Sequence, residues 1–96
     1  LKTRGLLDST LVVWMGEFGR TPKLGTGYNQ NLGAGHYAKC WTTALAGGGI
    51  KTGQVIGKTD EKGGEPTDHP VSAQDFLGTI CKILGIDFNK EYMTKE

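Results

Sequence analysis

Three side chains in the first half of the chain could carry chemistry: Glu17, Arg20 and His36. A carboxylate and a neutral imidazole can together bind a divalent metal ion, and Glu17 could also act as a general acid or base. The planar guanidinium of Arg20 could clamp a phosphate or sulfate group through two parallel hydrogen bonds. These residue types predict a site for a metal-assisted reaction on an anionic substrate.

Each of these residues also has an ordinary structural interpretation. Glu17 could cap a turn or form an ion pair with Arg20, and Arg20 could instead pair with Asp8. His36 lies in a glycine-rich stretch, where a single histidine is often a simple surface residue. The sequence alone leaves both interpretations open for each side chain.

Two other motifs favour structure over chemistry. In Thr67-Asp68-His69-Pro70, the spacing favours a turn in which Asp68 hydrogen-bonds to local backbone. Gly47-Gly48-Gly49 is not followed by the Lys-Ser/Thr of a phosphate-binding loop, so a strand-end turn is the better interpretation. No serine stands in a nucleophile elbow, and a Ser/His/Asp set is not assembled within this sequence.

The elements that must position the candidate residues are two apolar runs, Thr10–Met15 and Trp41–Ala46. Neither run alternates with polar residues, a pattern typical of strands buried on both faces of a parallel sheet. Ligands bind beyond the carboxyl ends of such strands, and Glu17 stands there. The long loop Gly16–Tyr37 would then bring His36 to the same edge.

The most completely specified element is a helix near the end of the sequence. Ser72 and Asp75 have the spacing of a capping box, and Val71 and Phe76 that of a hydrophobic staple. Apolar residues then recur at helical spacing until Gly85, which is typical of a helix end. This helix is expected to pack on the sheet, with a polar tail over residues 89–96.

Size and composition indicate one small α/β domain with a modest core. The chain has 96 residues, 16 glycines and 36% apolar residues, which is low for a globular domain. It starts at Leu1, and Leu1–Leu7 has the pattern of a helix already under way. We therefore expect the carboxyl-terminal piece of a larger protein, with a processed small protein as the alternative.

Charge and cysteine usage exclude several classes of function. The net charge is +1 with both signs interspersed, so no basic patch indicates nucleic-acid binding and no cationic helix indicates a membrane surface. No run is apolar enough to span a bilayer. Cys40 and Cys81 have no metal-binding spacing, and packed thiols are favoured over a disulfide between them. The localisation is not determined by these residues.

Several motifs in order carry a family resemblance. They are VVWMGEFGRTP at 12–22, GH at 35–36, ALAGGGIKTGQVIG at 44–57 and TDHPVSAQDFLGTICKILGID at 67–87. From about Leu6 to Phe88, the sequence resembles the bacterial domain-of-unknown-function family 1501. That family is in turn similar to the alkaline phosphatase and sulfatase superfamily.

The resemblance implies a three-layer α/β/α sandwich, of which residues 1–88 would be the carboxyl-terminal portion, with a hydrolytic metal site at the strand ends. It implies that Glu17 is the late-strand acid and that His36 stands where the family commonly has Asp-His. Here Gly35 replaces that aspartate. The nucleophile would lie upstream of Leu1, and the parent would be periplasmic or secreted.

The resulting expectation is part of a metal-dependent hydrolase. Glu17 and His36 would bind zinc, calcium, magnesium or manganese, and Arg20 would orient the ester. The substrate would be a small phosphate or sulfate ester, or a sulfated or phosphorylated polymer, and this piece alone would be inactive. The alternatives are a non-catalytic module of the same fold, and a small domain that self-associates through unpaired sheet edges.

Overall fold

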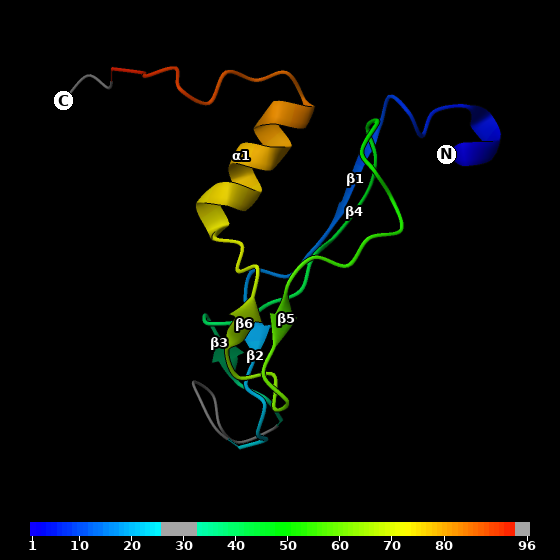
Figure 1. Cartoon of the computed structure of the whole chain (residues 1–96). Helices are drawn as coiled ribbons and strands as arrows, with labels where there is room; N and C mark the ends of the chain where they lie inside the picture. The colour runs from blue at the N-terminus through cyan, green and yellow to red at the C-terminus, as the bar shows by residue number, and fades with distance from the viewer. Residues whose placement is uncertain (26–32, 94–96) are drawn as a thin grey trace.

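The computed structural model describes residues 1–25 and 33–93, and it contains short strands and one α-helix (Figure 1). In chain order the elements are η1 (Lys2–Arg4), β1 (Leu11–Trp14), β2 (Gly19–Arg20), β3 (His36–Tyr37), β4 (Ala44–Gly47), β5 (Lys58–Thr59), β6 (Pro66–Asp68) and α1 (Ala73–Ile83). The predicted mixture of helix and strand is therefore confirmed.

In the described parts of the chain, the strands form three separate antiparallel pairs, β1–β4, β2–β3 and β5–β6. In the first pair Leu11 lies opposite Gly47 and Trp14 opposite Ala44. The expectation of a parallel sheet was thus wrong for these strands. The same residues show no three-layer sandwich, because that architecture needs a continuous sheet with helices on both faces.

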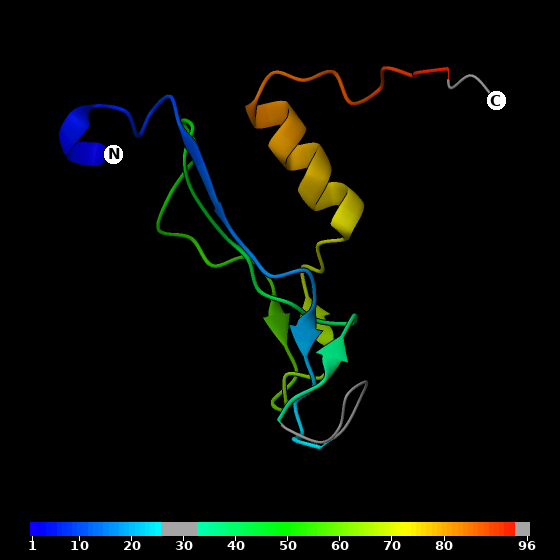
Figure 2. The ribbon, with the colours of Figure 1, turned by 180° about the vertical axis from the view of Figure 1, so that it is seen from behind.

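The apolar run at Thr10–Met15 does form a strand, but the strand is not buried. The exposed fractions are 38% for Val12, 37% for Val13 and 70% for Trp14. In Figures 1 and 2, α1 stands to one side of the β1–β4 ribbon, so no second layer encloses both faces of β1. The second predicted strand, Trp41–Ala46, is shifted to β4.

Helix α1 begins and ends as its sequence predicts. The Ser72 hydroxyl accepts the Asp75 backbone N–H at 3.0 Å, and the Asp75 carboxylate accepts the Ser72 N–H at 3.2 Å, completing the capping box. At the other end Gly85 has φ 69°, and the Ile86 N–H donates to the Cys81 carbonyl at 2.8 Å. This is the Schellman closure that a C′ glycine permits.

Other local predictions were only partly right. The helix expected at Leu1–Leu7 is the single turn η1, and Lys58–Pro70, expected to be a loop, contains the β5–β6 hairpin. Part of the predicted loop at 16–37 and the end of the polar tail lie outside the described residues. Both cysteines are free thiols. In the described part of the chain, no helix is long and apolar enough to cross a membrane.

Little of the described structure is buried. Phe76, with 8% of its surface exposed, is the only buried hydrophobic residue among those described. The accessible surface of the chain is 8441 Å², whereas a compact monomer of 10.3 kDa exposes about 5,400 Å². The radius of gyration, 16.9 Å, likewise exceeds the roughly 12.5 Å of a compact domain of this length. The chain is extended and its core is small.

Candidate functional site

The short β2–β3 pair brings two candidate residues together from distant parts of the sequence. In its register Arg20 lies opposite His36, and Gly19 lies opposite Tyr37. Residues directly opposite in an antiparallel pair place their side chains on the same face. Arg20 and His36 therefore share one face of this small sheet.

Glu17 joins this pair from the turn that precedes β2. Its Oε1 lies 3.7 Å from Nε2 of His36, and the Phe18 ring lies 5.6 Å from the imidazole, centroid to centroid. The side chains of His36 and Glu17 are 43% and 65% exposed. Both side chains are therefore open to solvent, and a contact this exposed contributes little to stability.

The structure separates Glu17 from the partner that the alternative interpretation gave it. Among the residues described, no ion pair joins Arg20 to Glu17 or to Asp8. The Glu17 carboxylate instead lies beside the His36 imidazole. Two residues must lie this close if they are to bind the same metal ion. Whether these residues bind a metal remains a prediction.

The geometry of Glu17 and His36 suits part of a metal site. Two ligand atoms about 2.1 Å from a tetrahedral ion lie about 3.4 Å apart, close to the 3.7 Å observed. In the described part of the chain, however, no group of three or more His, Cys, Asp or Glu side chains surrounds a common point. The two residues could therefore supply two ligands, and other ligands would have to come from elsewhere.

Backbone and side-chain contacts fix the strands that carry the candidate residues. Thr21 and Gly35 exchange hydrogen bonds next to the β2–β3 pair: the Thr21 N–H donates to the Gly35 carbonyl, and the Gly35 N–H donates to the Thr21 hydroxyl, both at 3.0 Å. The Tyr37 hydroxyl donates to the Gly64 carbonyl at 2.7 Å and so ties β3 to the β5–β6 hairpin. The residues before and after His36 are thus both fixed by hydrogen bonds, Gly35 by Thr21 and Tyr37 by Gly64.

An electrostatic contact reinforces the link to that hairpin. The Lys39 ammonium lies 2.7 Å from the Glu65 carboxylate, and this hydrogen-bonded charge raises the pKa of Lys39 above its usual value. Burial, together with the negative charges of Asp60 and Glu65, raises the pKa of the neighbouring Cys40 thiol. The raised pKa disfavours the thiolate form of Cys40 and so lowers its reactivity as a nucleophile.

An apolar groove of roughly 320 Å³ opens beside Glu17. Its walls come from the segment between β1 and β2, the segment after β3 and the first turns of α1. They include the aromatic side chains of Phe18, Trp41 and Phe76. The sequence patterns did not identify this groove, because its residues are far apart in the chain.

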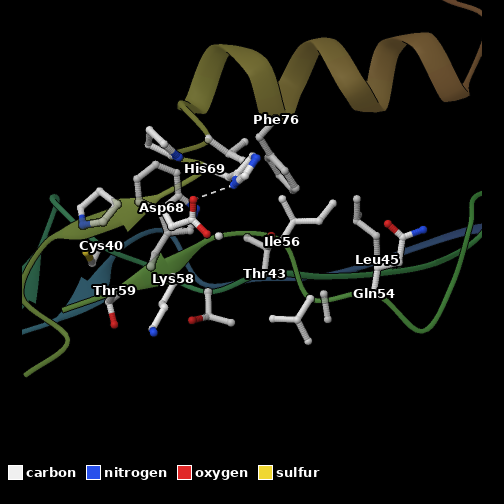
Figure 3. A pocket seen from close by; sticks show the side chains of 18 of the residues that line it. Cys40, Thr43, Leu45, Gln54, Ile56, Lys58, Thr59, Asp68, His69 and Phe76 are labelled. Atoms are coloured by element: carbon white, nitrogen blue, oxygen red, sulfur yellow. Dashed lines mark hydrogen bonds and ion pairs between the residues drawn. The ribbon is translucent and has the colours of Figure 1, made fainter. Parts of the chain in front are cut away.

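A second, larger cavity of roughly 650 Å³ is lined by the β5–β6 hairpin, by α1 and by residues 39–45 and 50–57 (Figure 3). Here Nδ1 of His69 is 2.7 Å from the Asp68 carboxylate, and His69 has a φ of 40°, unusual for a residue other than glycine. The prediction of a turn in which Asp68 hydrogen-bonds to local backbone was wrong, because Asp68 ends strand β6 and its carboxylate contacts the His69 imidazole instead. Trp41 and Phe76 line both cavities.

A comparison with protein families gives the identity of the chain. Residues 1–96 match the model of a family described as "Protein of unknown function (DUF1501)", and the chain belongs to that family. Searches of curated proteins and of solved structures gave no significant match.

Proposed function

We propose that this member of the DUF1501 family is part of a metal-dependent hydrolase that acts on phosphate or sulfate esters. The observation that carries the proposal is the 3.7 Å approach of the Glu17 carboxylate to the His36 imidazole, with Arg20 opposite His36 on β2. This arrangement supports a metal site formed by Glu17 and His36, with Arg20 on the same face of the β2–β3 pair to bind an anion.

Each residue has a distinct role in this proposal. Glu17 and His36 contribute two ligands to a divalent cation such as zinc, manganese, magnesium or calcium. When bound, the cation would polarise the ester oxygen and stabilise developing negative charge. Arg20 binds the non-reacting oxygens of the phosphate or sulfate and fixes their orientation. The same contacts would serve a small ester or a charged polymer.

The proposal includes polypeptide beyond the residues described. The nucleophile and the remaining ligands come from another part of the protein, which also completes the alkaline-phosphatase-like sandwich over β1 and α1. The large exposed surface of the chain supports this view, because apolar residues on both sides of β1 lack a covering layer. The 96 residues by themselves are then expected not to turn over substrate.

Metal binding tests the proposal directly. Isothermal titration of the chain with Zn²⁺, Mn²⁺, Mg²⁺ and Ca²⁺ is expected to show one site for at least one ion. Glu17→Gln and His36→Ala should each weaken that site by about tenfold or more, because a ligand is lost. The experiment measures metal affinity and not catalytic activity, so it can be carried out on the isolated chain.

The Asp68–His69 pair provides the matched control. His69→Ala and Asp68→Asn remove the same two kinds of side chain from a second exposed pair, at 2.7 Å. These variants should leave the affinity unchanged. Equal losses in both pairs, or no binding of any of the four ions, would contradict the proposal.

One observation favours a second candidate, a binding or structural module that keeps the fold without turnover. Glu17 and His36 have no third metal-ligating side chain beside them in the described part of the chain. Such a module could bind an anion through Arg20 without a metal. Binding of inorganic phosphate or sulfate that does not depend on added metal would favour it.

A further inference from the structure

We propose that Tyr37 is a positioning residue, which holds the His36 imidazole beside Glu17 through a hydrogen bond to the Gly64 carbonyl. Tyr37 acts on the site through the backbone of β3, and Asp60 in turn fixes Gly64. This inference rests on the proposed function, because it concerns the ligand geometry of the same candidate metal site. It goes beyond that function by giving the turn of the β5–β6 hairpin a role in the site.

Strand β3 is too short to fix a metal ligand by itself. It consists of His36 and Tyr37, and its partner β2 also has two residues. An isolated pair of strands is only marginally stable in water. A ligand, in contrast, must stay within about 0.5 Å of its productive position. A further anchor on β3 is therefore needed to keep the imidazole in place.

The two residues of β3 face opposite sides of the strand, because successive side chains in a strand alternate between its faces. His36 shares one face with Arg20, so Tyr37 projects from the other. There its hydroxyl donates to the Gly64 carbonyl at 2.7 Å. Figures 1 and 2 both show the β5–β6 hairpin next to the β2–β3 pair. The anchor thus leaves the face that carries His36 open to a metal ion.

The acceptor of this hydrogen bond is itself held in place. The Asp60 carboxylate accepts the backbone N–H groups of Gly64 at 2.7 Å and of Lys62 at 3.1 Å. The Asp60 N–H donates to the Glu65 carbonyl at 3.0 Å and so closes the turn. The backbone hydrogen bonds, above all that from Gly64, hold the pKa of Asp60 below its ordinary value. The carboxylate therefore stays charged at neutral pH, and hydrogen bonds to a charged acceptor are the stronger kind.

A second contact joins the same two segments but contributes less. The Lys39 ammonium lies 2.7 Å from the Glu65 carboxylate, and the two side chains are 63% and 62% exposed. Ion pairs this exposed contribute little, because water screens them. The Tyr37 hydroxyl, in contrast, makes its hydrogen bond in a partly buried position. The position of β3 therefore depends mainly on Tyr37.

The experiment measures the metal affinity of Tyr37→Phe, which removes the hydroxyl and keeps the ring. The ion used is the one that the wild-type chain binds most tightly among Zn²⁺, Mn²⁺, Mg²⁺ and Ca²⁺. Without the anchor, His36 must be ordered when the ion binds. The affinity should therefore fall about three- to tenfold, which corresponds to the net contribution of one hydrogen bond. Tyr92→Phe makes the same change at a tyrosine that is 78% exposed, and it should leave the affinity unchanged.

Two variants of Asp60 test the support of Gly64 independently. Asp60→Ala removes the acceptor of the Gly64 N–H and should weaken metal binding to a similar extent. Asp60→Asn keeps an oxygen that can accept the same N–H group and should restore most of the affinity. Ser72→Ala controls for general destabilisation, because it removes a cap of α1 and no contact of β3. It should leave the metal affinity unchanged.

A second measurement needs no metal ion. The rings of Phe18 and His36 lie 5.6 Å apart, centroid to centroid, so NMR of the metal-free wild type should show a nuclear Overhauser effect between their ring protons. This signal should weaken in Tyr37→Phe and in Asp60→Ala, because the imidazole then leaves its position. It should persist in Tyr92→Phe and in Ser72→Ala.

The outcomes separate this inference from the proposed function. If the wild type binds an ion and Tyr37→Phe binds it equally tightly, or Ser72→Ala weakens it as much, the inference is overturned and the metal site stands. If no ion binds but the ring signal is lost only in Tyr37→Phe and Asp60→Ala, the positioning of His36 is supported and the metal-dependent function fails. An unchanged ring signal in Tyr37→Phe overturns the inference in either case.

Discussion

Gly19 holds the two strands of the candidate site together because it has no side chain. It lies in β2, buried against the segment after β3. A methyl group at this position would overlap the Cys40 carbonyl and lie 2.9 Å from the Tyr37 carbonyl oxygen. Its backbone angle is not the constraint, since its φ is not positive. The glycine permits the close approach that places Arg20 beside His36.

We therefore expect Gly19→Ala to disrupt the site as well as to destabilise the chain. Forcing a methyl group into a packed contact typically costs about 1–3 kcal/mol. Urea unfolding would measure the free energy, and Zn²⁺ titration would measure the accompanying loss of metal affinity. Gly16→Ala is the matched control, because its nearest neighbour would be the Phe18 carbonyl at 3.6 Å. Equal effects of the two changes would contradict this explanation.

The candidate residues were predictable as types, but their partners were not. The sequence placed Glu17 and His36 in one glycine-rich region and allowed a Glu17–Arg20 ion pair as an alternative. The structure brings Glu17 to His36 and pairs Arg20 with His36 across β2–β3. Which charges meet depends on strand register, and register is set by contacts between residues far apart in sequence.

At the scale of elements, α1 is the part of the fold that local sequence determines most completely. Its capping box and its Schellman closure each lie within six residues. Replacement of the N-cap, Ser72→Ala, should destabilise the helix by about 1 kcal/mol, because the Asp75 N–H loses its acceptor. Circular dichroism with urea would measure this change. Ser9→Ala removes a serine hydroxyl that does not cap the helix, since it donates to the Leu6 carbonyl, and should have no such effect on the helix.

Helix α1 should also depend on pH through Asp75. The hydrogen bonds from the Ser72 hydroxyl and backbone N–H hold the pKa of Asp75 below its ordinary value. A carboxyl with a lower pKa in the folded state stabilises that state at neutral pH, and this contribution disappears as the pH falls below about 4. Helix content should decrease over that range in the wild type relative to Asp75→Asn. If the helix content of the wild type and of Asp75→Asn changes with pH in the same way, Asp75 does not have this role.

The strands were less predictable than the helix. The apolar run Thr10–Met15 predicted a strand correctly, but it predicted burial and parallel pairing incorrectly. β-Propensity reflects how well side chains fit a pleated surface. It therefore does not tell whether other layers cover the strand or leave it exposed. The β5–β6 hairpin was missed because its polar residues resemble a loop.

At the scale of the whole molecule, the unusual property is the amount of uncovered surface. The chain exposes about 3,000 Å² more than a compact monomer of its mass would. The open edge of β1 carries no charged residue that would prevent pairing with another strand. An edge of this kind favours association when nothing covers it.

The isolated chain is therefore expected to self-associate with increasing concentration. Val13→Lys places a charge in the middle of β1 and should shift the mass measured by light scattering toward the 10.3 kDa of one chain. Val55→Lys is the matched control, since Val55 is 96% exposed and lies outside the strands. A monomer at every concentration, or equal effects of the two lysines, would contradict this expectation.

The sequence by itself determined the elements whose interactions are local: α1 with both its caps, the presence of β1, and the mixture of helix and strand. Capping and periodicity act over a few residues, so they can be recognised without knowledge of the fold. Only the tertiary structure decided that the strands pair antiparallel, that β1 is exposed and that Glu17 faces His36. These features depend on which distant segments meet, and on the surface that remains after they have met.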